Sequence, residues 1–191
     1  MRIHGDKTIR RRCGLEQRQY REYENELRED FHYLCGYCGK SEEVSKKGFE
    51  PDHFIPQKIA PEQKNDYSNL VYSCFICNRK KGGKWPTNNS KRANDGVIGF
   101  VDPATKEYDL HLSRDASGKI ISNTPVGEYM KNVFQFDKRP IERIWKAMKI
   151  KELKNKLREK WDKLSLVEKD EYAKIDIELD SLLQYIFEKK E

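Results

Sequence analysis

Four of the five cysteines form two C-x2-C pairs, and these pairs are the strongest chemical signal in the chain. Two such pairs can place four thiolates around one metal ion, and tetrahedral sites of this composition are typical of structural zinc. A redox pair is the alternative interpretation, but the presence of two pairs favours a closed metal site. The predicted zinc ligands are Cys35, Cys38, Cys74 and Cys77. Cys13 has no such partner, and we expect it to be an ordinary thiol.

An Asp-His pair lies between the two cysteine pairs, in the stretch FEPDHFIPQK. His53 is suited to taking a proton from water near neutral pH, because the unperturbed pKa of imidazole is about 6.5. Asp52 and, further along, Asn78 offer oxygen ligands, which suit a hard ion such as Mg²⁺ or Mn²⁺ better than zinc. A purely structural zinc module needs little beyond its cysteines. This set of acid, base and amide therefore needs its own explanation.

The spacing of these residues resembles that of the HNH endonuclease family. The resemblance covers about residues 35–85 and rests on DHFIP, on NL beginning at Asn69, and on CNRKK at 77–81. It implies a metal-dependent nuclease that hydrolyses DNA phosphodiester bonds and leaves 5′-phosphate and 3′-hydroxyl ends. It also implies a ββα-metal fold, with one strand ending near His53, a second strand over residues 70–73 and a helix that starts between residues 75 and 78.

The resemblance also implies a role for each residue of the motif. His53 resembles the general base, and Asn69 resembles the residue that holds the loop and orients this histidine. Asp52 and Asn78 resemble ligands of a catalytic Mg²⁺ or Mn²⁺; the asparagine replaces the last histidine of the family name, as in the HNH domains of CRISPR effector nucleases, and leaves the identity of the metal open. Lys81 resembles a phosphate-binding residue. The neighbouring basic residues expected to contact DNA are Arg79, Lys80 and Lys84.

The adjacency of Asp52 and His53 raises a geometric difficulty. Neighbouring residues on a regular strand point to opposite faces, so these two side chains cannot both face one phosphate from an ideal strand. We therefore expect an irregular strand edge at this point. Pro51 and Pro56 would produce it, because each proline removes a backbone donor and restrains φ.

Two further interpretations remain open. The first is a non-catalytic zinc-ribbon module that binds nucleic acid or protein, although such a module has no need for the acid, base and amide together. The second keeps the nuclease and makes it the effector of a bacterial anti-phage system with an ATPase partner. It rests on the longer pattern NDYSNLVYSCFICNRKKGGKWP with GFVDP downstream, which resembles small stand-alone HNH proteins.

The elements around this finger indicate an α+β chain of 191 residues. Apolar residues at helical spacing predict a helix over about 15–33, and polar-apolar alternation around a glycine predicts a small β-hairpin after the finger. The predicted parts are a basic segment with a helix (1–34), the HNH finger (35–86), a loop and β-hairpin (87–137) and amphipathic helices (138–191). The arginines at 10–12 form either a phosphate contact or a solvated run of charge.

The last two helical segments carry opposite charge. Residues 138–164 hold eleven Lys or Arg against four Asp or Glu, and residues 165–191 hold four against eight. Two antiparallel helices of opposite charge are therefore expected, the second capped by Ser165 and Glu168. Either they form a solvated hairpin, or they dock a partner or DNA.

The composition sets limits on the core and on the location of the protein. Charged residues make up 37% of the chain, so we expect a thin apolar core and a fold that depends on a bound zinc ion for its stability. The net charge of +6 permits a polyanionic partner without requiring one. We expect a soluble cytoplasmic protein, because no segment is typical of secretion or of membrane insertion.

Overall fold

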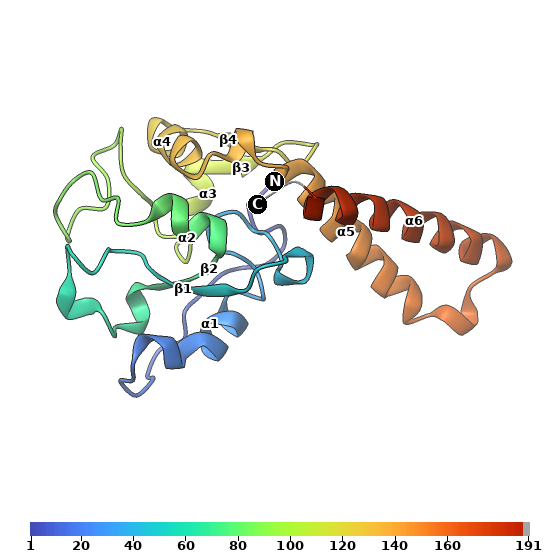
Figure 1. The fold of residues 1–191 in the computed structure, drawn as a ribbon, viewed down its shortest axis with the longest axis horizontal. Coiled ribbons are helices and arrows are strands. Elements are labelled where there is room, and N and C mark those ends of the chain that lie inside the picture. Colours follow the sequence, from blue (N-terminus) through green and yellow to red (C-terminus); the bar gives the residue numbers. More distant parts are fainter. Residues whose placement is uncertain (189–191) are drawn as a thin grey trace.

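The centre of the structure is a hairpin of two antiparallel strands that leads directly into a short helix (Figure 1). Strand β1 covers Phe49–His53, strand β2 covers Leu70–Cys74 and helix α2 covers Phe75–Lys81. The predicted ββα arrangement is confirmed. The structure is a computed structural model and describes residues 1–188.

The pairing of β1 with β2 is regular along its whole length. The opposed residues are Phe49 and Cys74, Glu50 and Ser73, Pro51 and Tyr72, Asp52 and Val71, and His53 and Leu70. The N–H of Phe54 then donates to the carbonyl of Asn69 at 2.7 Å. Because bonded residues alternate in an antiparallel pair, the nitrogen of Pro51 faces the outer edge, where no N–H is required. The prediction of an irregular strand edge is therefore wrong. The side chains of Asp52 and His53 leave a regular strand on opposite faces.

The N-terminal helix is shorter than predicted. A 3-10 turn, η1, covers Tyr20–Tyr23, and helix α1 covers Glu24–Asp30. The helix ends early because His32 and Tyr33 adopt positive φ angles of 53° and 61°, which turn the chain toward the first cysteine pair. Its apolar stripe packs on the finger, since Leu27 is fully buried and α1 contacts β2.

The segment after the finger contains more helix than predicted. Beside the expected hairpin of β3 (Leu112–Arg114) and β4 (Ile120–Ser122), it forms a helical turn, α3 (Tyr108–His111), and a helix, α4 (Pro125–Phe134). Thr124 caps α4 by accepting a hydrogen bond from the N–H of Gly127 at 3.1 Å. A Cβ on Gly127 would lie only 2.0 Å from the carbonyl oxygen of His111, so glycine permits α4 to pack closely against α3.

The C-terminal segments form the predicted antiparallel pair, α5 (Ile141–Arg158) and α6 (Leu166–Glu188), which extends away from the body as an arm (Figure 1). Residues 189–191 of the predicted second segment lie outside the described residues. The predicted capping pair is present, since the N–H of Ser165 donates to Glu168 at 2.8 Å. Lys146 and Glu178 pair across the two helices at 2.5 Å. None of the described helices is both long and apolar enough to cross a membrane.

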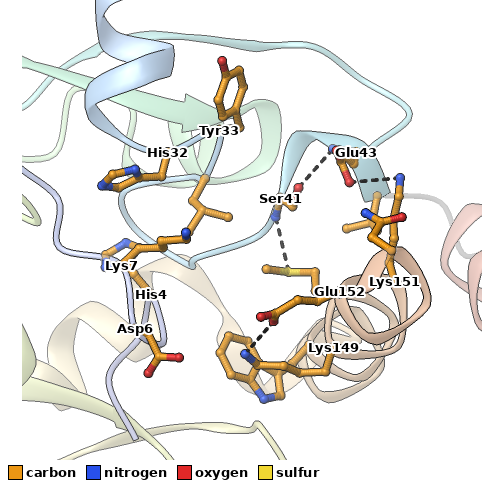
Figure 2. A pocket seen from close by; sticks show the side chains of 15 residues that line it. His4, Asp6, Lys7, His32, Tyr33, Ser41, Glu43, Lys149, Lys151 and Glu152 are labelled. Atoms are coloured by element: carbon orange, nitrogen blue, oxygen red, sulfur yellow. Dashed lines mark hydrogen bonds and ion pairs between the residues drawn. The ribbon is translucent and has the colours of Figure 1, made fainter. Parts of the chain in front are cut away.

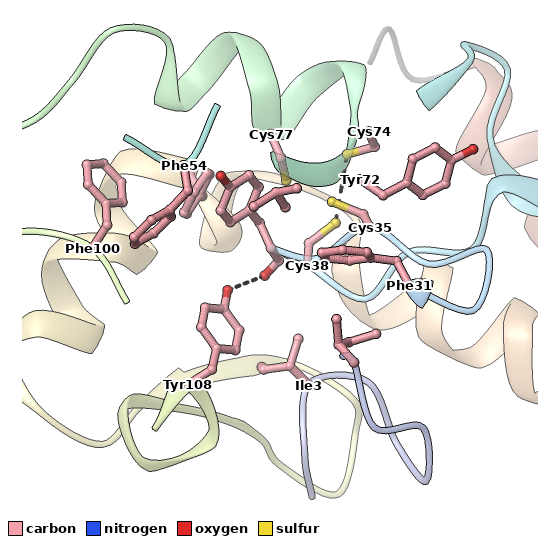
Figure 3. Packing of buried hydrophobic residues seen from close by; sticks show 14 of the residues in the cluster. Ile3, Phe31, Cys35, Cys38, Phe54, Tyr72, Cys74, Cys77, Phe100 and Tyr108 are labelled. Atoms are coloured by element: carbon pink, nitrogen blue, oxygen red, sulfur yellow. Dashed lines mark hydrogen bonds between the residues drawn. The ribbon is translucent and has the colours of Figure 1, made fainter. Parts of the chain in front are cut away.

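One continuous apolar core joins the finger to segments on either side of it (Figure 3). Tyr37 of the first cysteine loop stacks on Phe134 of α4, with ring centroids 4.8 Å apart. Trp85 packs between Phe54 and Phe100, which belong to the finger and to the segment that follows it. The expectation of a thin core is therefore wrong, because the finger shares its core with most of the body.

Candidate functional site

The four cysteines of the predicted zinc site come together where β2 meets α2 (Figure 3). Their sulfur atoms all lie within 4.8 Å of one another, and all four side chains are buried. The sulfur atoms of Cys38 and Cys74 are 3.9 Å apart. Two thiolates on a tetrahedral zinc ion with 2.3 Å bonds should be about 3.8 Å apart, whereas a disulfide brings its sulfur atoms to about 2.05 Å. The cluster therefore fits a structural zinc ion.

Arg139, from outside the cysteine loops, caps this cluster. Its guanidinium nitrogens lie 3.2 Å from the sulfur of Cys77, 3.7 Å from that of Cys38 and 3.9 Å from that of Cys74. Burial alone would lower the pKa of Arg139, but the negative charge of these thiolates raises it above its usual range. Four thiolates around Zn²⁺ leave excess negative charge, and N–H···S bonds from a cation stabilise that charge.

Replacing Arg139 with glutamine is expected to weaken zinc binding about 10- to 100-fold, the usual effect of losing an outer-shell partner. Competition with a chromophoric chelator measures this affinity directly. Lys138→Gln removes the same charge from the neighbouring exposed residue and is the matched control. Equal zinc affinity in the two variants would contradict a role for the Arg139 contacts.

His53 ends β1, and its two hydrogen bonds assign its ring nitrogens. Nε2 lies 2.7 Å from the backbone carbonyl of Lys64, an acceptor, so Nε2 carries the proton. Nδ1 lies 3.3 Å from the amide nitrogen of Gln57, a donor, so Nδ1 presents its lone pair. This second bond is longer than the usual 2.9–3.0 Å or so, and Gln57 is exposed, so a water molecule can replace it. The arrangement leaves Nδ1 able to accept a proton.

The surroundings of His53 keep it neutral. Burial lowers its pKa below the usual value of 6.5, against the opposing effects of the Lys64 carbonyl and the charge of Asp52. The ring of Tyr20 meets the imidazole edge-on at 4.8 Å between centroids. A neutral imidazole at pH 7 is the form that a general base requires.

An open cavity of about 370 Å³ lies against the residues that hold His53. Three of its lining residues contact the imidazole, namely Tyr20, Gln57 and Lys64. The others are Gln19 and Arg21, from the segment that precedes the finger. The sequence did not indicate that these residues border His53, because residues 19–21 lie outside the motif and were expected only as the start of a helix.

Asn69 fastens the loop that follows β1. Its Oδ1 accepts from the N–H of Ile55 at 2.8 Å, and its Nδ2 donates to the carbonyl of Ile55 at 3.0 Å. Among the described contacts none joins Asn69 to His53. An orienting effect on His53 would therefore pass through the loop, whose Lys64 carbonyl holds the ring.

Lys81 lies inside the core rather than at the surface. Its side chain is fully buried, and its ammonium donates to the carbonyl of His53 at 2.6 Å and pairs with Asp52 at 3.1 Å. The hydroxyl of Tyr37 donates to the same carboxylate oxygen at 2.5 Å. Burial raises the pKa of Asp52 and lowers that of Lys81, in both cases against their mutual attraction. The prediction that Lys81 contacts phosphate is therefore wrong in this structure.

The face of β1 that carries Asp52 also carries Glu50, two residues earlier. Oε1 of Glu50 is buried and has no hydrogen-bond partner within residues 1–188. The only described ion pair on this face joins Asp52 to Lys81, so no cationic side chain pairs with the carboxylate of Glu50 among the described residues. An excess of negative charge on hard oxygen donors fits a divalent cation such as Mg²⁺ or Mn²⁺.

Asn78 and His53 are placed differently with respect to Asp52. Asn78 lies on α2, which packs against β1, and its half-exposed side chain has no hydrogen bond in the described part of the chain. His53 contacts η1 and the loop on the other face of the strand. The structure therefore does not bring the acid and the histidine to one common surface.

The basic residues predicted to contact DNA are only partly free to do so. Arg79 and Lys84 are exposed, whereas Lys80 is half-buried and donates to Gln135 at 2.6 Å. The predicted run at 10–12 is divided. Arg11 forms a two-bond ion pair with Asp102 at 2.8 and 2.9 Å, and Arg12 pairs with Asp30 at 2.8 Å. Arg11 is therefore held in a largely buried ion pair, whereas Arg12 is paired but exposed, as a solvated charge would be.

A separate cavity of about 420 Å³ lies where the arm joins the body (Figure 2). It contains none of the predicted site residues. Two of its lysines already form ion pairs, Lys149 with Glu152 at 3.1 Å and Lys151 with Glu43 at 3.0 Å. Its walls therefore connect α5 to the first cysteine loop rather than to His53.

Comparison with known protein families gives a match over the finger. Residues 35–84 match the model of the HNH endonuclease family, the segment that holds the ββα finger and all four clustered cysteines. No curated protein and no solved structure matches the chain. The resemblance inferred from the motif is confirmed over this segment.

Proposed function

Starting from an HNH domain at residues 35–84, we propose that the protein is an endonuclease that hydrolyses phosphodiester bonds in DNA, with His53 as its general base. The observation that carries this proposal is the state of His53, whose Nε2 proton is held by Lys64 and whose Nδ1 faces an exposed, replaceable donor. The open cavity lined by Tyr20, Gln57 and Lys64, the residues that contact the imidazole, is where a nucleic-acid strand would approach this nitrogen once Gln57 is displaced.

In the proposed reaction, a water molecule replaces the Gln57 amide at Nδ1. The imidazole takes one proton from this water as its oxygen attacks phosphorus. The bond from phosphorus to the 3′ oxygen breaks, and the leaving oxygen takes up a proton from solvent to become the 3′ hydroxyl. The Lys64 carbonyl stabilises the imidazolium that forms, because it already accepts the Nε2 proton. General-base catalysis of this kind contributes about 10²- to 10⁴-fold in rate.

The proposed ligands of a catalytic ion are Asp52 and Asn78. A Mg²⁺ or Mn²⁺ ion held there would supply positive charge to the phosphate and the leaving oxygen. Because Asp52 and His53 leave β1 on opposite faces, the end of β1 would have to rearrange for both to act on one phosphate. Lys81 holds Asp52 in the core, and this contact has to loosen before the carboxylate can serve as a ligand. The finer proposal of an anti-phage system with an ATPase partner rests on the sequence pattern alone.

The pH dependence of cleavage tests the state of His53. Because burial lowers its pKa below 6.5 and only the neutral form is a base, kcat/KM is expected to stay level near neutral pH. The rate should fall on acidification, with a midpoint below 6.5. Initial rates on a labelled oligonucleotide across this range measure the midpoint. A midpoint above the usual histidine value would contradict the assignment of His53.

Cleavage assays test the activity itself. Purified protein is incubated with supercoiled plasmid and with single-stranded DNA, with and without Mg²⁺ or Mn²⁺. Nicked or linear products that depend on the ion and on His53 support the endonuclease. Binding without cleavage under all these conditions supports the alternative described next.

A non-catalytic zinc module that binds nucleic acid is the second candidate, and one observation favours it. Asp52 and Lys81 are committed to each other in the core, on the face of β1 opposite His53. A module that only binds DNA requires neither residue to be free. This candidate predicts that His53→Ala leaves every measurable property except local stability unchanged.

A further inference from the structure

The burial of Lys81 leaves open which cation meets the phosphate beside His53. The cavity against His53 contains two cationic side chains, Arg21 and Lys64, and no acidic residue lines it. Both residues are exposed. The charge around this cavity is therefore positive, and the cavity is lined by Gln57, the residue that meets the Nδ1 atom of His53.

Within the described residues, three arginines of the N-terminal segment form no ion pair, namely Arg2, Arg10 and Arg21, and of these only Arg21 lines this cavity. Four of the five arginines between residues 11 and 28 pair with a carboxylate, namely Arg11, Arg12, Arg18 and Arg28. Arg21 forms no ion pair within the described residues. Its Nε donates to the hydroxyl of Tyr20 at 3.0 Å, and its guanidinium lies 5.6 Å from the centre of the same ring. The ring thus directs an unneutralised guanidinium to the rim of the cavity.

Tyr20 fixes this arrangement relative to His53. Its ring packs against the imidazole, and its backbone N–H donates to Oδ1 of Asn65 at 3.1 Å, in the loop that carries Lys64. The arginine, the lysine and the base therefore belong to one contiguous set of contacts. A guanidinium beside an ammonium suits a phosphodiester, because Arg binds two phosphate oxygens at once and Lys adds a point charge.

We propose that Arg21 and Lys64 hold the scissile phosphodiester of a DNA strand beside His53, a role that rests on the proposed endonuclease function. Arg21 lies before the HNH segment at 35–84, so the substrate site extends beyond the finger. The two cations stabilise the charge that accumulates on the non-bridging oxygens as the attacking water adds to phosphorus.

Arg21→Gln tests this role in two assays. Loss of one charge-assisted hydrogen bond to the substrate is expected to lower kcat/KM about 10- to 100-fold. Arg28→Gln is the matched control, since Arg28 is exposed but pairs with Glu42. This control should cleave within about twofold of the unchanged protein, as expected for an exposed ion pair. If Arg21→Gln cleaves at the control rate while His53→Ala is inactive, the proposed role of Arg21 is wrong and the proposed endonuclease function is unaffected.

The second assay does not depend on cleavage. DNA affinity is measured against salt concentration in a His53→Ala background, with and without Arg21→Gln. Loss of one phosphate contact should reduce the slope of log K against log[salt] by about 1. An unchanged slope overturns the proposal even when the protein cleaves no DNA. Circular dichroism and zinc content, both expected to be unchanged, confirm that each variant is folded.

Discussion

Cys74→Ser is expected to remove the zinc ion and unfold the protein. A structural zinc site contributes about 10–16 kcal/mol, whereas the whole stability of a domain is about 5–15 kcal/mol. The effect should spread beyond the finger, because Cys74 and Cys77 belong to the same apolar core as Phe100 and Phe134. Elemental analysis should find much less than one zinc per chain, and thermal unfolding should lose its cooperative transition.

Cys13→Ser is the control for this variant. Cys13 is exposed and lies outside the cluster, so its replacement should leave both zinc content and melting temperature unchanged. Full zinc content and an unchanged transition in Cys74→Ser would show that the four cysteines do not form a metal site that stabilises the fold.

His53→Ala is expected to lower the cleavage rate by about 10²- to 10⁴-fold, because it removes the general base. The fold should persist, since within residues 1–188 the imidazole forms hydrogen bonds to Lys64 and Gln57 alone and none to a cysteine of the zinc cluster. DNA affinity should also persist, because Arg21 and Lys64 remain. Cleavage rates on a labelled oligonucleotide, with melting temperature and zinc content measured in parallel, distinguish a loss of catalysis from a loss of folding.

His32→Ala provides the comparison for this second variant. His32 is an exposed histidine whose ring contacts the carbonyl of Thr8, outside the cavity beside His53. It should cleave at the rate of the unchanged protein. Undiminished cleavage by His53→Ala would show that another group activates the water.

The parts of the site that could be predicted from the sequence are those set by short-range spacing. Two C-x2-C pairs define four sulfur positions almost independently of the rest of the chain. The family resemblance implied the positions of the two strands and of the helix that begins at Phe75, whereas the regular pairing of β1 at Asp52 and His53 was not predicted. Family resemblance named His53, and burial together with two hydrogen bonds then gave its protonation state.

The parts that could not be predicted depend on contacts between distant segments. A lysine one turn after Asn78 resembles a surface cation in sequence, and only its contacts with Asp52, the His53 carbonyl and the ring of Phe100 account for the burial of Lys81. Arg139 and Arg21 lie in stretches rich in charge, where nothing distinguishes a partnered arginine from a solvated one. Helix α4 had a readable start at Thr124 and Pro125 that our interpretation missed.

The position of Arg139 in the chain has a consequence for biosynthesis. The cysteines are synthesised first, and Arg139 follows 62 residues after Cys77. At typical elongation rates of about 5–20 residues per second, the ribosome needs about 3–12 s to add that length. Nascent chains therefore pass through an interval in which all four thiolates are available to a metal but lack their cation. Zinc bound in that interval is expected to exchange more readily than zinc in the finished chain. Once Arg139, two residues before α5, has been added and contacts the sulfur atoms, the cluster is better protected from metal loss and thiol oxidation.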